Sequence, residues 1–340
     1  MRAKVAAVAM VKNECDIIEL FVRINSRAVD HLYIIDHNSN DATIEILGCL
    51  VLEGLPLSVL RETQLDFKQA DILTKQIKII AASNAYDFIV PLDADEFIHC
   101  GENHFGVLLA SEINKPGHCG HMRWATYAPV TSTPFLADSS IYDLFRMRSN
   151  EPTQYYKTII PNEIAKICRL QEGSHFCILN NMRIVSIEVS AILQHVPIRS
   201  AAQIISKALL GYHFLSIKPG RLRNEGLFWD QMAKFIKEKN YTLSNYDVSW
   251  LACRYTLDLE QEIPATPSLN EAAPRVGKPE DRISFIEFAA ISPVSNLDTL
   301  CAELCEEVNK LRQLARQTIT PRVQTKSNSI LSRLIASFGK

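Results

Sequence analysis

Apolar runs of strand length alternate with helical patterns along the first hundred residues. The run "KVAAVAMV" at 4–11 is apolar at nearly every position, which is typical of a strand buried on both faces. Residues 14–28 then repeat apolar side chains three and four positions apart, the spacing of one helix face. The same alternation predicts strands at 31–36, 57–62 and 86–93 and helices at 39–54 and 68–85. Strands separated by helices predict an α/β fold with a mostly parallel central sheet and flanking helices.

The pattern changes after residue 100. Short β-prone runs, broken by Pro, Asn and Gly, predict further strands and long irregular loops on one side of the sheet. These runs lie at 121–130, 157–161, 175–179 and 183–195. Helical patterns return from residue 200, an irregular stretch is expected at 260–280, and a helical stripe follows from 297 to 311.

These shifts divide the chain into four expected parts. They are an α/β half at 1–100, a second half of the same domain at 101–215, a helical extension at 216–315 and a basic tail at 316–340. From Val308 to Lys340 the chain carries seven Lys or Arg and no acid. We expect a solvated or disordered tail, and the alternative is a cationic amphipathic helix in weak contact with a membrane surface.

Composition narrows the class of protein. A net charge of -2 gives no general attraction to nucleic acid. The chain has nine cysteines, an odd number, and no two of them form a Cys-x-x-Cys motif. We therefore expect reduced thiols in a cytoplasmic protein, and the alternative location is the inner surface of the membrane. No apolar stretch approaches the roughly 20 residues that span a bilayer.

The strongest chemical signal is the segment "FIVPLDADEFIHC". An apolar strand runs into three acids within four residues, a cluster that is costly without a cation. Side chains two apart on an extended segment point the same way, so Asp93 and Asp95 can share one divalent ion. Mn²⁺ and Mg²⁺ take carboxylate oxygens together with substrate phosphates, which predicts a diphosphate ligand. The alternative is a solvated acidic turn.

Polar residues also follow the first two strands. Asn13 and Glu14 come after the first, and Asp36, Asn38 and Ser39 after the second. Because parallel strands end at the same edge of a sheet, these side chains should open onto the crevice that holds Asp93. Carboxylate and amide groups there suit hydrogen bonds to a ribose or a base, although neighbouring polar residues can also cap the next helix.

In these blocks the sequence resembles the GT-A-fold glycosyltransferases of family 2 and its relatives, especially the group with a DADEF core. The resemblance rests on "VKNECDIIELFVRINSRAVDHLYIIDHNSNDATIEIL", "FIVPLDADEFI" and "HVPIRSAAQIISKALLG". It implies that 1–100 is the nucleotide-sugar-binding half and 101–215 the acceptor-side half of one GT-A domain. It also implies donor binding at Asp36 and a metal at Asp93 and Asp95. Such enzymes often add a His from the second half of the chain. His195 is preferred here because Arg199 and Lys207 behind it could hold the leaving diphosphate, and His175 is the alternative.

The resemblance predicts a soluble enzyme that moves a hexosyl group from a UDP-linked sugar to a saccharide or another hydroxyl acceptor. An inverting transferase needs a base, and the sequence does not choose among Asp143, Glu163 and Glu172. A retaining mechanism stays open. Two other functions use the same acids: a metal-dependent nucleotidyltransferase or phosphohydrolase, and a non-catalytic nucleotide-sugar-binding domain. The segment "MVKNECD" lacks the Gly-rich basic loop of nucleotidyltransferases, which favours glycosyl transfer.

Overall fold

The computed structural model describes residues 2–62, 69–129, 139–151, 153–218, 221, 226–255, 269–271 and 274–282. The chain forms two compact units. One comprises Met1–Ala201 with Ser244–Ala289, and the other comprises Ala202–Leu243 with Ala290–Lys340. All the features of the candidate site described below belong to the first unit, and the four-part division expected from the sequence stays a prediction.

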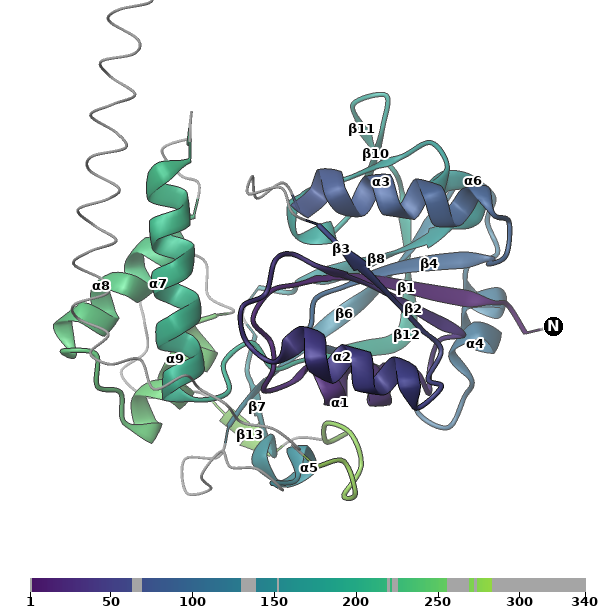
Figure 1. Cartoon of the computed structure of the whole chain (residues 1–340). Helices are drawn as coiled ribbons and strands as arrows, with labels where there is room; N and C mark the ends of the chain where they lie inside the picture. The colour runs from purple at the N-terminus through teal and green to yellow at the C-terminus, as the bar shows by residue number, and fades with distance from the viewer. Residues whose placement is uncertain are drawn as a thin grey trace, which may run out of the picture. The chain divides into compact units, whose positions relative to one another are not determined.

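The first unit begins with a parallel sheet that matches the alternating pattern of the sequence. Its strands are β1 (Val5–Val11), β2 (His31–Asp36), β3 (Leu57–Arg61) and β4 (Phe88–Leu92), in the order β3-β2-β1-β4 with every neighbouring pair parallel. The connecting helices are α1 (Ile18–Asn25), α2 (Thr43–Leu52) and α3 (Gln69–Ala82). The predicted α/β fold class is confirmed (Figure 1).

Strand β1 is buried on both faces, and its alternate side chains enter two different cores. Val5 and Ala7 belong to the cluster that includes the apolar faces of α1 and α2. Ala6 and Val8 belong to the cluster that includes α3 and the short helix α6 (Asn162–Ala165). Helices therefore cover both faces of the parallel sheet, as Figure 1 shows. This arrangement leaves the edge formed by the strand ends for ligands.

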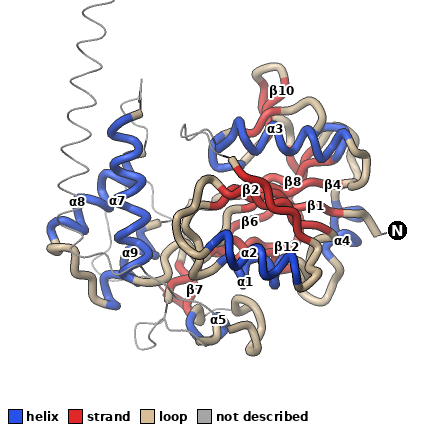
Figure 2. Tube along the Cα trace, in the orientation of Figure 1, coloured by secondary structure: helices blue, strands red, loops and turns tan. Residues whose placement is uncertain are grey.

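The second half of this unit extends the sheet with strands of mixed direction (Figure 2). β8 (Tyr156–Pro161) runs antiparallel to β4, β6 (Cys119–Ala128) runs antiparallel to β8, and β12 (Ser186–His195) runs parallel to β6. β5 (Glu96–His99) pairs with β12, while β7 (Met147–Ser149) and β13 (Leu269–Glu271) pair beyond β6. A separate small sheet holds β9 (Arg169–Leu170), β10 (Cys177–Leu179) and β11 (Met182–Arg183).

Several short elements were not expected from the sequence. Helix α4 (Phe105–Glu112) lies in a region where we expected loops, and its core side chains Phe105, Leu108 and Leu109 are buried. Its first turn is capped by the ring of His104, which accepts a hydrogen bond from the Gly106 amide. The remaining short elements are α5 (Ile141–Leu144) and the turn η1 (Glu172–Ser174), while α9 (Asn245–Arg254) falls within the helical extension expected at 216–315. Strand β13 falls within the stretch expected to be irregular, most of which lies outside the described residues.

The described part of the second unit is helical. It consists of α7 (Ala201–Ile217) and α8 (Leu227–Glu238). The two helices approach closely at Gly211, where a Cβ would lie only 2.9 Å from the Trp229 ring. No helix in the described parts of either unit is both long and apolar enough to cross a membrane. The expected stripe at 297–311 and the basic tail lie outside the described residues. Of the seven described cysteines, all are free and five are buried.

Candidate active site at the carboxyl edge of the sheet

The three acids lie in the turn between β4 and β5. In the parallel registers Val11 stands beside Asp36 and Ala9 stands beside Leu92, so the carboxyl ends of β1, β2 and β4 share one edge. The Glu96 amide donates to the carbonyl of Asp93 over 3.1 Å, which closes the turn. The chain thus places Asp36 and the acid segment along the same edge, where open α/β sheets bind ligands.

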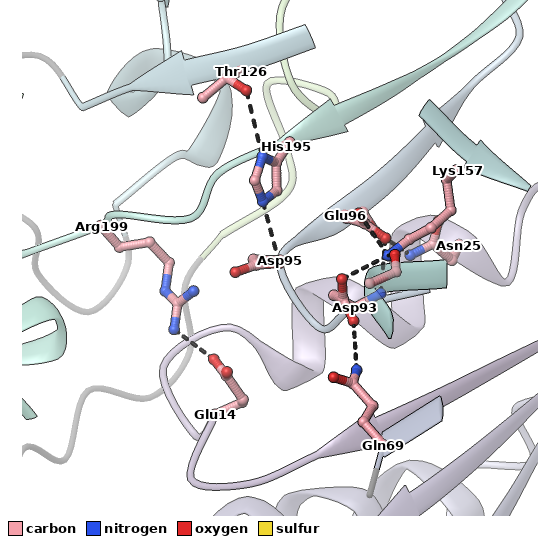
Figure 3. Close-up of polar contacts among 11 residues, drawn as sticks. Glu14, Asn25, Gln69, Asp93, Asp95, Glu96, Thr126, Lys157, His195 and Arg199 are labelled. Atoms are coloured by element: carbon pink, nitrogen blue, oxygen red, sulfur yellow. Dashed lines mark hydrogen bonds and ion pairs between the residues drawn. The ribbon is translucent and has the colours of Figure 1, made fainter. Parts of the chain in front are cut away.

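Asp95 faces His195 (Figure 3). Its Oδ1 lies 3.7 Å from His195 Nε2, and the two side chains are 5% and 2% exposed. The antiparallel register of β5 and β12 puts His195 directly opposite Glu96, which brings the two segments together across a hundred residues of sequence. His195 Nδ1 lies 3.4 Å from the Thr126 hydroxyl, and the ring packs on Trp124 with centroids 4.1 Å apart. Both ring nitrogens therefore have a polar neighbour, which fixes the orientation of the imidazole.

Asp93 has different partners from Asp95. Its Oδ2 accepts a hydrogen bond from Lys157 Nζ over 2.6 Å, and its Oδ1 accepts one from Gln69 Nε2 over 3.0 Å. The Asp93 side chain is 32% exposed, whereas Lys157 is 1% exposed. Burial lowers the pKa of Lys157, but the carboxylates of Asp93 and Glu96 outweigh it, so the pKa lies above its ordinary value and the ammonium stays charged.

Glu96 is the fully buried acid of the segment. Its Oε2 accepts the Asp93 amide over 2.8 Å, its Oε1 lies 3.1 Å from Lys157 Nζ, and its backbone carbonyl accepts from Asn25 Nδ2 over 2.9 Å. The Asn25 Oδ1 in turn accepts the Ile98 amide. Complete burial raises the pKa of Glu96 well above its ordinary value, although Lys157 acts in the opposite direction. Glu96 and Asn25 therefore hold the shape of the turn.

The loops after β1 and β2 are bound to each other. The Asn13 amide donates to Ser39 Oγ over 3.0 Å, and Asn13 Oδ1 accepts the Asn40 amide over 2.9 Å. Asp36 is 1% exposed and accepts the Ser39 amide at 3.3 and 3.4 Å. Asn38 is exposed at the tip. Much of the hydrogen-bonding capacity of Asn13 and Ser39 thus holds the two loops together, and the nucleotide-binding role expected for these residues stays a prediction.

Glu14 and Arg199 belong to a buried ion cluster with Asp16. Arg199 Nε and Nη2 donate to the two oxygens of Asp16 over 2.6 and 2.8 Å, and Nη2 also donates to Glu14 Oε2 over 2.6 Å. The three side chains are 1%, 3% and 11% exposed for Arg199, Asp16 and Glu14. Burial lowers the pKa of Arg199, but the two acids outweigh it and raise the pKa overall. The cluster joins the loop after β1 to the segment after β12.

The other predicted residues are spread over the fold. His175 donates from Nδ1 to the Tyr156 carbonyl over 2.7 Å, and its ring packs on Trp124 and Tyr155. Burial lowers the pKa of this ring, and the nearby Asp93 carboxylate acts in the opposite direction. Glu172 is exposed in η1, and Lys207 lies on α7 in the second unit.

Two of the predicted bases lie on short helices. Asp143 is 61% exposed on α5 and lies 4.0 Å from Arg275. Glu163 is exposed on α6, which follows β8 at the amino end of β4, opposite Asp93. The structure therefore brings neither of them to the acid turn.

Sequence reasoning missed Lys157, Thr126 and Glu151. Glu151 Oε1 accepts the Thr126 amide over 2.8 Å, while Oε2 lies 3.8 Å from Arg148 and has no hydrogen-bond partner among the described residues. Burial raises the pKa of Glu151, opposed by hydrogen bonds from Thr126. One signal was present in the sequence: Lys157 is the single charged residue in the apolar strand "YKTIIP".

The Asp95–His195 pair can hold a divalent cation. A carboxylate oxygen and an imidazole nitrogen are both metal ligands, they already face each other, and the second nitrogen of the ring has a hydroxyl neighbour. Within the residues that the structure describes, no group of three or more His, Cys, Asp and Glu side chains gathers as a metal site. Two protein ligands suit an ion that completes its coordination with phosphates and water.

No protein-family profile matches the chain, and no curated protein matches its sequence. Similar solved structures include glucosyl-3-phosphoglycerate synthase from Mycobacterium tuberculosis in complex with Mn²⁺, uridine diphosphate and glucosyl-3-phosphoglycerate. It is 20% identical with a TM-score of 0.25, over 36% of this chain and 43% of the synthase. The 1–349 segment of S. aureus TarS is 13% identical with a TM-score of 0.32, over 71% of this chain and 72% of that one.

A third similar structure is 4-diphosphocytidyl-2C-methyl-D-erythritol synthase, at 12% identity and a TM-score of 0.30, over 48% of this chain and 76% of that one. The matched region spans less than half the length of the mycobacterial synthase. Similarities this low say nothing about the reaction of this chain.

Proposed function

We propose that this protein is a metal-dependent glycosyltransferase that moves a hexosyl group from a UDP-linked sugar to a saccharide or another hydroxyl acceptor. The observation that carries the proposal is the pairing of Asp95 with His195 at the carboxyl edge of the parallel sheet, beside the partly exposed Asp93. The resemblance of the acid segment and the first helix to family 2 transferases points to the same reaction.

Asp95 and His195 would hold the cation. When bound, the ion would neutralise the diphosphate as the bond to the sugar breaks. The imidazole would supply a ligand without adding negative charge, and imidazole ligation favours Mn²⁺ over Mg²⁺, whose preferred ligands are oxygens. His195 must present Nε2 as a lone pair, so its Nδ1 carries the proton and donates to Thr126 Oγ1, 3.4 Å away.

The donor would lie along the edge formed by the ends of β1, β2 and β4. Asp36 at the end of β2 is the proposed contact for the nucleoside, because its carboxylate is held in place by the Ser39 amide. Asn38 at the exposed tip of the same loop offers an amide to the base. Arg199 remains the proposed cation for the diphosphate, and it would have to act from within its pair with Asp16 and Glu14.

The acceptor hydroxyl has to lose a proton in an inverting reaction. Glu151 is the candidate that we favour: its Oε1 accepts the Thr126 amide, the Thr126 hydroxyl lies 3.4 Å from His195 Nδ1, and burial raises the pKa of Glu151 above its ordinary value. Asp143, Glu163 and Glu172 are exposed and lack such an environment. We therefore propose Glu151 as the base, ahead of the three acids expected from the sequence.

A binding panel tests the metal and donor assignments. UDP, other nucleoside diphosphates and their sugars are titrated with and without Mn²⁺ into the wild-type protein and the D95N, H195Q and D71N variants. We expect Mn²⁺-dependent binding of a uridine nucleotide that D95N and H195Q weaken by about tenfold or more, since each removes a ligand. D71N is the matched control, because Asp71 is an exposed acid on α3. Nucleotide affinity that is the same with and without Mn²⁺ and is unchanged in D95N would reject Asp95 as a metal ligand.

A further inference from the structure

The ammonium of Lys157 is buried among three acceptors inside the protein. An ammonium has three N–H donors. Acceptors lie at 2.6 Å for Asp93 Oδ2, 3.1 Å for Glu96 Oε1 and 3.3 Å for the Gly173 carbonyl. The side chain is 1% exposed, so the charge cannot turn toward a ligand without breaking these contacts. Lys157 therefore acts on the site through its neighbours rather than by touching a substrate.

The principal neighbour is Asp93, whose carboxylate is held on both oxygens. Lys157 takes Oδ2, and Gln69 Nε2 takes Oδ1 over 3.0 Å (Figure 3). Each oxygen has a second lone pair, so Asp93 can still accept a hydrogen bond from a hydroxyl at its exposed side. Coordinating a metal would require the same carboxylate to share its charge with a cation beside an ammonium already 2.6 Å away.

Lys157 also joins the acid turn to the segment before His175. Gly173 has a φ of +75°, a conformation that glycine adopts readily, and this turn aims its carbonyl at the ammonium. A Cβ on Gly173 would lie 2.6 Å from His175 Nε2, so the turn is tightly packed. The position of the ammonium is thus fixed from two sides of the site.

Resting on the proposed function, we propose that Lys157 is a positioning residue that holds Asp93 out of the metal's coordination, so that one divalent cation binds at Asp95 and His195 and binds strongly only together with the nucleoside diphosphate. Asp93 then serves as a hydrogen-bond acceptor for a donor hydroxyl. This separates the roles of the two aspartates, which the spacing of the sequence motif alone assigns to one ion.

Charge explains the dependence on the nucleotide. The fixed ammonium repels a divalent cation at short range and offsets the negative charge of Asp93, which leaves Asp95 as the acid that faces the ion. A nucleoside diphosphate brings its own negative charge and phosphate oxygens, which complete the coordination. Removing the ammonium should therefore strengthen the binding of the metal alone, the opposite of what losing a purely structural contact would do.

The test measures Mn²⁺ affinity by titration calorimetry and electron spin resonance, without nucleotide and with saturating UDP. In the wild type, UDP should strengthen Mn²⁺ binding by about tenfold or more. K157M should bind Mn²⁺ alone about tenfold more tightly or better than the wild type, because a unit charge beside a divalent ion has at least this effect even when strongly screened. K157M should at the same time raise the KM for the donor, since Asp93 loses its fixed orientation.

Two further variants separate the loss of the Lys157 charge from a general loss of charge and from a failure to fold. K166M removes the same charge from α6, where Lys166 bonds Asn84 at the far end of β4, and should match the wild type. The double variant K157M/E96Q removes the ammonium together with its buried acid partner and covers the case in which K157M does not fold.

Unchanged or weaker Mn²⁺ binding in a folded variant lacking the ammonium would overturn the inference, as would equal wild-type affinity with and without UDP. A wild type that binds no Mn²⁺ even with UDP would instead reject the proposed function.

Discussion

Replacing Arg199 with methionine should destabilise the protein strongly. Methionine has a similar length but no charge, so R199M removes the three charge-assisted hydrogen bonds to Asp16 and Glu14 while filling most of the space. The two carboxylates are 3% and 11% exposed and would stay buried without a counter-charge. The loss should therefore exceed what an exposed ion pair contributes.

The magnitude follows from the burial. Breaking a buried pair by removing one partner costs about 3–5 kcal/mol, because the remaining charge is left in a poorly solvated place. The triple variant R199M/D16N/E14Q is the matched control, since it removes the acids as well as the guanidinium and leaves no buried charge in the cluster. We expect it to recover most of the lost free energy of unfolding.

Urea unfolding followed by fluorescence and circular dichroism measures both effects. The reasoning fails if R199M lies within about 1 kcal/mol of the wild type, the value expected of an exposed pair. It also fails if the triple variant is no more stable than R199M, because stranded carboxylates would then not be the cause of the loss.

Three further predictions concern packing and pH. G106A should lower the free energy of unfolding by about 1–3 kcal/mol, because its Cβ would meet the Ala3 carbonyl at 2.1 Å. G48A on α2 is the control: its Cβ has nothing within 4 Å, so it should stabilise the protein by about 0.5–1 kcal/mol. Equal effects of the two variants in thermal melts would contradict this prediction. E151Q should lower kcat/KM by about 100-fold or more, because the base works only when it is ionised. It should also remove the acid limb of the pH–rate profile, which in the wild type lies above the ordinary carboxyl pKa because burial raises the pKa of Glu151. An unchanged pH–rate profile would reject this role. Burial raises the pKa of Glu96 in the folded state, so the stability that its neutral form contributes is lost as pH rises through that value. E96Q should therefore gain stability relative to the wild type between acid and alkaline pH in urea titrations, and the opposite trend would show that Glu96 stabilises the fold as an anion.

The parallel half of the fold could be predicted from the sequence because each element there is locally complete. The run at 4–11 is apolar on both faces, and β1 is indeed buried at all of its positions. Helix α4 was missed because it is short and lies among Gly, Asn and Pro residues that favour loops.

The acid segment was likewise readable, since Asp93 and Asp95 stand together in the sequence. The resemblance also pointed to His195, which the structure places beside Asp95. The partner of Asp93 was missed, because Lys157 reaches it through strand pairing over a separation of 64 positions. A lysine within an apolar strand signals a buried acid partner but does not say which acid. The pairing of Arg199 with Asp16 across 183 positions has no local signal.

The proposed reaction transfers a sugar from a nucleotide with the help of a metal at Asp95 and His195. The most direct measurement follows the release of UDP from a panel of UDP-hexoses by nuclear magnetic resonance, with Mn²⁺ and with chelator. We expect the wild type and D71N to release UDP from at least one of them only when Mn²⁺ is present, and D95N to lose at least about 100-fold in rate, since the leaving diphosphate would no longer be neutralised. Release that is independent of Mn²⁺ and unchanged in D95N, or no release from any of these donors, would contradict metal-dependent sugar transfer at Asp95 and His195.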